Sequence, residues 1–122
     1  MSKHLDLSDL QSTNDLEEID VEVPEWGGFI RLRTMTGEAK DAYEQSLFEE
    51  NEKGSYERNL ENARAKLIAA CAIGPDGKRM FKSADEIRLL GNKSAKAIDR
   101  VYEKCRELNA ISDGDVEEIA GN

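Results

Sequence analysis

The sequence predicts an α+β fold that is mostly helical, with a small N-terminal β-hairpin packed on a bundle of about five helices. Two observations lead to this prediction. Residues 20–23 and 30–33 alternate polar and apolar side chains around a Gly27-Gly28 pair, as two half-buried strands joined by a turn do. After Thr36, apolar residues recur at helical spacing, and capping residues precede most of these stretches.

The predicted hairpin has one apolar face, made by Val21, Val23, Ile30 and Leu32. Pro24 ends its first strand, and Gly27-Gly28 supplies the positive φ that a turn needs. A two-stranded hairpin is marginal in water, so we expect it to lie on the helices. Trp26 stands at the tip, where it either packs into the core or serves as an exposed anchor for another protein. The packed position is favoured, because the only tryptophan of a small domain more often points inward.

Helices are predicted near residues 37–50, 56–72, 84–90, 93–108 and 112–120. Their caps are assigned to Thr36, Ser55, Ser83 (as a capping box with Glu86) and either Asn92 or Ser94. The second helix carries an apolar stripe of Leu60, Ala63, Leu67, Ile68 and Cys71. The longest carries Ile98, Val101, Tyr102, Cys105 and Leu108. Between them, residues 74–77 (Gly-Pro-Asp-Gly) predict a tight turn.

The charge pattern divides the chain into unlike blocks. Residues 1–18 hold one base and five acids, a net −4, and are expected to form a flexible acidic arm. Residues 19–122 are expected to form a single helical domain with the N-terminal hairpin. Within it, residues 36–62 carry −5 (three bases, eight acids) and residues 63–111 carry +5 (eleven bases, six acids). These blocks are either ordinary solvated faces or complementary surfaces of neighbouring copies, and the second interpretation predicts self-association.

The residues offer little that could support catalysis. The only histidine, His4, lies in the arm, and the two cysteines, Cys71 and Cys105, are 34 positions apart in helical patterns. No zinc-ligand spacing or phosphate-binding glycine loop occurs, so the sequence predicts no enzyme, no cofactor and no metal site. The cysteines are expected to be buried free thiols.

Membranes and nucleic acids are not expected partners. No apolar run approaches the ~20 residues of a membrane span, and the first residues lack the apolar segment of a signal peptide. The net charge of −9 opposes an approach to DNA. An acidic protein can instead imitate DNA, so a DNA mimic or an inhibitor of a host DNA-binding enzyme is the alternative function.

A collinear set of turn and core residues covers about residues 20–118. It comprises Val23-Pro24-Glu25-Trp26-Gly27-Gly28, Ile30-Arg31-Leu32-Arg33, Thr36-Gly37-Glu38, Ala63-Arg64 with Leu67, Asp76-Gly77-Lys78 with Phe81, Leu90-Gly91-Asn92-Lys93-Ser94-Ala95, Ile98-Asp99-Arg100 and Leu108-Asn109. In this set the chain resembles the tail assembly chaperones of long-tailed, non-contractile bacteriophages. The resemblance implies a mostly helical, non-virion protein in the cytoplasm of the bacterial host. It would bind the tape measure protein, keep it soluble and promote tail tube assembly.

The resemblance also implies a frameshift-extended form that recruits the tail tube protein. It carries over no functional residues, so the partner-binding candidates come from the residues themselves. They are large apolar side chains expected to remain outside the core: Phe29, Leu90 and Tyr102, with Trp26 in reserve.

Overall fold

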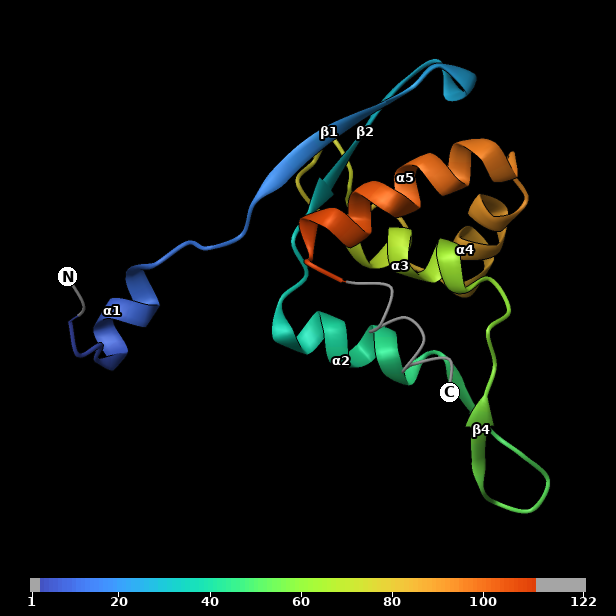
Figure 1. Cartoon of the computed structure of the whole chain (residues 1–122), viewed down its shortest axis with the longest axis horizontal. Coiled ribbons are helices and arrows are strands. Elements are labelled where there is room, and N and C mark those ends of the chain that lie inside the picture. Colours follow the sequence, from blue (N-terminus) through green and yellow to red (C-terminus); the bar gives the residue numbers. More distant parts are fainter. Residues whose placement is uncertain (1–2, 112–122) are drawn as a thin grey trace.

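The computed structural model describes residues 3–111, so the helix predicted over 112–120 lies outside the described residues. The predicted α+β, mostly helical class is confirmed. The elements in chain order are α1 (Leu7–Ser12), β1 (Glu18–Val23), the short 3-10 turn η1 (Pro24–Trp26), β2 (Gly28–Arg33), α2 (Gly37–Gln45), β3 (Phe48–Glu50), β4 (Tyr56–Arg58), α3 (Ala63–Cys71), β5 (Ala72–Ile73), α4 (Ala84–Gly91) and α5 (Ala95–Leu108). Figure 1 shows β1 and β2 as a long hairpin beside α3, α4 and α5.

The β1–β2 hairpin forms as predicted and is joined by a third strand. Its antiparallel register pairs Val21 with Ile30 and Val23 with Gly28. All four residues of the predicted apolar face are buried. Only Gly27 of the glycine pair takes a positive φ, at 78°. The sequence did not predict β5, which pairs with Arg31 and Leu32 on the other edge of β2.

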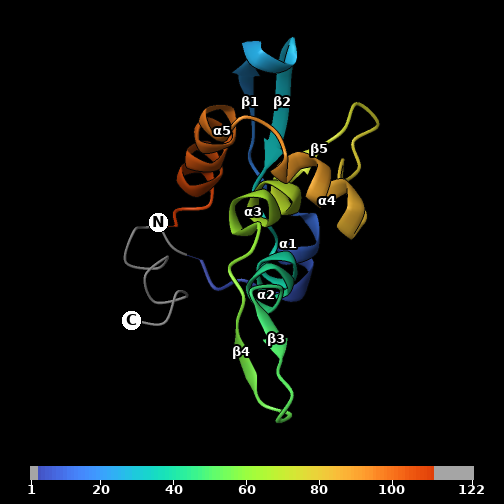
Figure 2. The ribbon, with the colours of Figure 1, turned by 90° about the vertical axis from the view of Figure 1, so that its right-hand side faces the viewer.

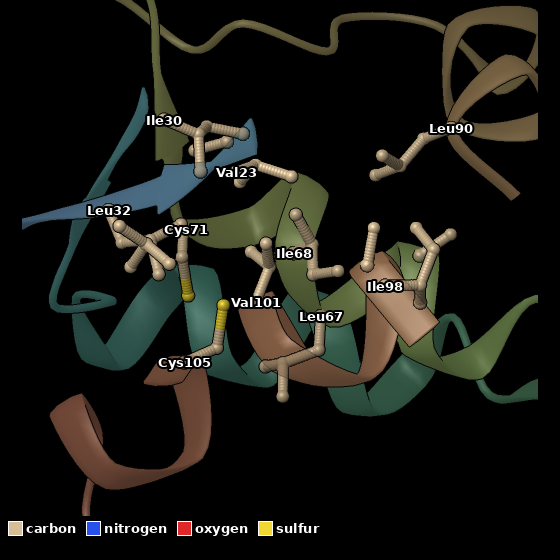
Figure 3. Packing of buried hydrophobic residues seen from close by; sticks show 14 of the residues in the cluster. Val23, Ile30, Leu32, Leu67, Ile68, Cys71, Leu90, Ile98, Val101 and Cys105 are labelled. Carbon is tan, nitrogen blue, oxygen red and sulfur yellow. The ribbon is translucent and has the colours of Figure 1, made fainter. Parts of the chain in front are cut away.

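The core lies where the hairpin face meets α3 and α5. Leu67, Ile68 and Cys71 of α3 pack with Val101 and Cys105 of α5, and all five are almost completely buried. Figure 3 shows the two cysteine side chains pointing toward each other, and both are free thiols. The predicted stripes of these two helices therefore identify the core seam correctly from Leu67 onward, whereas Leu60 lies before α3 and is 48% exposed.

The helix predictions for residues 46–50 and 56–62 were wrong. Helix α2 ends at Gln45 instead of residue 50, and α3 begins at Ala63 instead of residue 56. Between them β3 and β4 form a second antiparallel hairpin. Its turn is fixed by Asn51, whose side-chain oxygen accepts hydrogen bonds from the backbone of Lys53 and Ser55, each at 3.0 Å. Figure 2 shows this hairpin projecting from the end of the molecule opposite the β1–β2 tip.

The helix caps are partly as predicted. Thr36 and Ser94 accept hydrogen bonds from the third backbone amide of their helices, Ala39 and Ala97. Ser83 likewise accepts from Glu86. The predicted capping box is nevertheless incomplete, because the Glu86 carboxylate accepts from the backbone amide of Lys82, one residue before the cap.

The N-terminal arm contains a helix that the sequence did not predict. Asp6 and Asp9 cap α1 reciprocally, each side chain accepting a backbone hydrogen bond at 3.0 Å. No residue of α1 is buried, and Figure 1 shows it standing apart from the rest of the chain. The arm is fastened where β1 begins, because Glu17 and Thr34 exchange backbone and side-chain hydrogen bonds.

Within residues 3–111, no helix has the length and hydropathy needed to cross a membrane.

Candidate functional site

An apolar groove of about 300 Å³ lies between the tip of the β1–β2 hairpin and α4. That volume is at the lower end of the range for binding pockets in proteins. Its walls are formed by Val23, Trp26, Gly28, Phe29, Ile30, Met80, Phe81, Leu89, Leu90 and Lys93. The groove thus joins three segments that are far apart in the sequence.

The groove has a buried floor and an exposed rim. Val23, Ile30 and Leu90 make the floor and belong to the core; Figure 3 shows Leu90 on the α4 side, across from Val23 and Ile30. On the rim, Phe29 is 63% exposed and Leu89 is 58% exposed. Large apolar side chains gathered at a hollow with this much exposure are typical of an interaction surface.

The hairpin tip is held in place by an ion pair. Both carboxylate oxygens of Glu25 accept hydrogen bonds from the guanidinium of Arg100 on α5, at 2.6 and 2.9 Å. This contact lowers the pKa of Glu25 from 4.5 to about 2. Because Glu25 and Trp26 share one short 3-10 turn, the ion pair fixes the turn that presents Trp26 to the groove. A partner would therefore meet a pre-organised wall.

Three of the four candidate residues come together in this groove. Trp26 is partly buried and packs against the core while lining the groove, so both interpretations of it apply in part. Phe29 is exposed as expected. Leu90 is only 3% exposed, so the expectation that it remains outside the core was wrong. Its side chain faces the hairpin across the α4 interface and forms the floor.

Tyr102 lies outside the groove. Its ring is flanked by the guanidinium groups of Arg64 and Arg106, each 5.7 Å from the ring centre. This arrangement fixes the ring on the α3–α5 surface through cation–π contacts. Tyr102 therefore does not share a binding surface with the other three candidates.

Met80, Leu89 and Lys93 line the groove but were missed by the sequence analysis. Met80 lies at a bend after the 74–77 turn, and nothing local in the sequence indicates which element it meets. Leu89 precedes Leu90 on α4 and so points to a different face, which is a signal that could have identified it. Lys93 is the only charged residue among the groove's lining residues. It makes the groove suitable for an apolar segment with an acidic group at one end.

Comparison with known proteins gives one structural match. Family models and curated proteins yield no match to this sequence. The solved structure of the bacteriophage HK97 tail assembly chaperone matches with a TM-score of 0.55 and 25% sequence identity, over 88% of this chain and 96% of that chain. The match supports a role in phage tail assembly. It also confirms the resemblance found in the sequence to the tail assembly chaperones of long-tailed, non-contractile bacteriophages.

Proposed function

We propose that this protein binds an apolar helical segment of a tape measure protein and keeps it soluble, using the groove between the hairpin tip and α4. The observation that carries the proposal is the exposed apolar rim on a pre-organised groove, in a chain whose structure matches a tail assembly chaperone. The tape measure protein itself is taken from the family resemblance. The proposed activity is binding, with no catalytic step.

The shape of the groove suits a helix. A helix that binds in a groove inserts apolar side chains at spacings of three and four residues. Phe29 and Leu89 rise on opposite walls, above the floor made by Leu90. An apolar stripe inserted between these walls would be removed from water, at roughly 25 cal/mol for each Å² of apolar surface buried. Lys93 would meet an acidic residue or the carbonyl end of the bound helix.

The test is co-expression with the tape measure protein encoded by the same phage or prophage. Alone, the tape measure protein should sediment; with this chain it should remain in the supernatant as a complex. Phe29→Asp places a carboxylate on the rim and should abolish the rescue. Tyr56→Asp is the matched control, since Tyr56 is 74% exposed on β4, at the other end of the molecule. That variant should rescue as well as the unmodified chain.

Leu90→Ala is unsuitable as a binding variant. It removes a core side chain, so lost rescue could reflect lost folding. Tyr102→Ala tests the second predicted surface and should leave the rescue unchanged if the groove is the binding site. If the tape measure protein sediments equally with and without this chain, the proposal fails. The DNA-mimic alternative would then be tested by competition with duplex DNA for a host DNA-binding enzyme.

A second part of the proposal concerns the tail tube. We infer that a frameshift-extended form of this chain recruits the tail tube protein in the cytoplasm of the bacterial host. Its support is the family resemblance alone. A slippery heptamer near the end of the coding region, followed by an overlapping reading frame, is the expected nucleotide signature. Its absence, together with a single product on mass spectrometry of infected or induced cells, would contradict this part.

A further inference from the structure

The N-terminal arm presents large apolar side chains that are more than half exposed. Leu7 and Leu10, one turn apart on α1, are 71% and 61% exposed. Leu5, just before the helix, is also exposed. An isolated six-residue helix is unstable in water without packing. These leucines therefore make α1 suited to docking on an apolar surface.

The groove has the chemistry that this arm requires. Both surfaces are apolar, and their charges are opposite: residues 3–16 carry a net −2, from Lys3 against Asp6, Asp9 and Asp15, while the groove is lined by Lys93, and Lys82 follows the lining residue Phe81 in the sequence. Lys82 and Lys93 form no ion pair with any residue in 3–111. Two unpaired lysines beside an apolar hollow favour an occupant that is both apolar and acidic.

The arm is directed away from the groove of its own chain. Its base is fixed by the Glu17–Thr34 hydrogen bonds at the start of β1, whereas the groove lies toward the hairpin tip. The linker between α1 and β1, residues 13–17, spans at most about 18 Å. Within it Asn14 accepts a hydrogen bond from the backbone of Leu16. Figure 1 shows α1 on the opposite side of the molecule from α4.

We propose that α1 of one copy docks Leu7 and Leu10 in the Trp26–Phe29–Leu89 groove of a second copy, with the acids of the arm beside Lys82 and Lys93. The two surfaces are different, so the contact is heterologous: each copy that lends its arm still has an empty groove. Such a contact produces rings or open-ended rows of copies instead of closed dimers. The arm and a tape measure segment would occupy the same groove, so the two contacts are alternatives at any one copy; the test of the arm contact uses this chain alone.

The test uses two variants with complementary defects. Leu7→Asp combined with Leu10→Asp disables the arm and keeps the groove, while Phe29→Asp disables the groove and keeps the arm. All three positions are exposed, so both variants should retain the circular dichroism spectrum of the unmodified chain. The mass that light scattering gives for the unmodified chain should exceed the 13.7 kDa of a monomer and should increase with protein concentration. Each variant alone should be monomeric.

Mixing the two variants should restore association, but only to a heterodimer. The intact arm of Phe29→Asp enters the intact groove of the arm variant, and no further copy can add, so the mass should stop at twice 13.7 kDa. Tyr56→Asp, the matched control, should assemble like the unmodified chain. Any of three results would overturn the proposal. The unmodified chain could stay monomeric, either variant alone could assemble like the unmodified chain, or the mixture of the two variants could remain monomeric.

Discussion

Replacing Ile68 with aspartate should unfold most of the protein at neutral pH. Ile68 is 0% exposed at the centre of α3. Truncating a buried isoleucine to alanine costs about 2–5 kcal/mol. Aspartate adds a carboxyl group whose pKa must rise from ~3.9 to 7 or above if it remains buried without a partner, which costs about 4 kcal/mol more at pH 7. The total is about 6–9 kcal/mol.

That cost is comparable with the whole stability of a domain this size. At 0.05–0.15 kcal/mol per residue, a chain of 122 residues has about 6–18 kcal/mol. Urea titrations followed by circular dichroism should therefore show Ile68→Ala folded with a lower midpoint and Ile68→Asp largely unfolded without urea. Val101→Asp, also at 0% exposure, should behave like Ile68→Asp. The control is Leu10→Asp on α1; equal midpoints for Ile68→Asp and Leu10→Asp would refute the core assignment.

Three further predictions follow from particular contacts. Arg100 lowers the pKa of Glu25 from 4.5 to about 2, so the stabilisation by Glu25 is complete above pH 4.5 and disappears as the pH falls toward 2. Glu25→Gln should therefore unfold at lower urea than the unmodified chain at pH 6, with the gap closing near pH 2; a gap independent of pH would contradict this. A Cβ at Gly91 would lie 2.6 Å from the side-chain oxygen of Asn62, the outer end of a side chain that can turn aside, so Gly91→Ala should cost about 1 kcal/mol, the order of an off-rotamer side chain. In a double-mutant cycle with Asn62→Gly that cost should largely vanish, and additive costs would reject the clash. Finally, 1 M salt reduces the screening length to ~3 Å, so the assemblies should dissociate toward monomers, and light scattering that is indifferent to salt would show that charge contributes little to them.

Local patterns predicted the fold best where a surface is half buried. The alternation at 20–23 and 30–33 placed the hairpin face correctly, since burial on one side imposes a period of two. The stripe from Ile98 to Cys105 placed α5 for the same reason, with a period of 3.6. Strand β5 could not be predicted in this way, because two residues after α3 are too few to show a period.

Residues 46–62 were predicted poorly because helix propensity and turn chemistry conflict there. Glutamate and leucine favour helix, but Asn51 and Gly54 fix a tight turn, with Gly54 at a φ of 80°. Once the turn forms, Phe48 and Tyr56 fall on paired strands. The sequence analysis predicted helices on both sides of residues 51–55 and so missed the two strands.

The residues that line the groove were predicted only in part. Trp26 and Phe29 share the groove because they are neighbours at one hairpin tip, and such proximity is visible in the sequence. The contribution of Met80 and Lys93 depends on how residues 74–93 fold back on β2, which no local pattern specifies. For Leu90 and Tyr102, helical periodicity gave the face of the helix but not the element that covers it.

The two hairpins of this molecule point in opposite directions, β1–β2 at one end and β3–β4 at the other. The two ends of one copy are therefore different from each other. When one contact is repeated between identical units, every copy in the row has the same orientation, so the row has polarity. The β3–β4 hairpins, with Glu49 directly opposite Glu57, would then recur at regular intervals along it, all facing the same way. A filament-like partner lying along such a row would be contacted in a single direction from its first copy to its last.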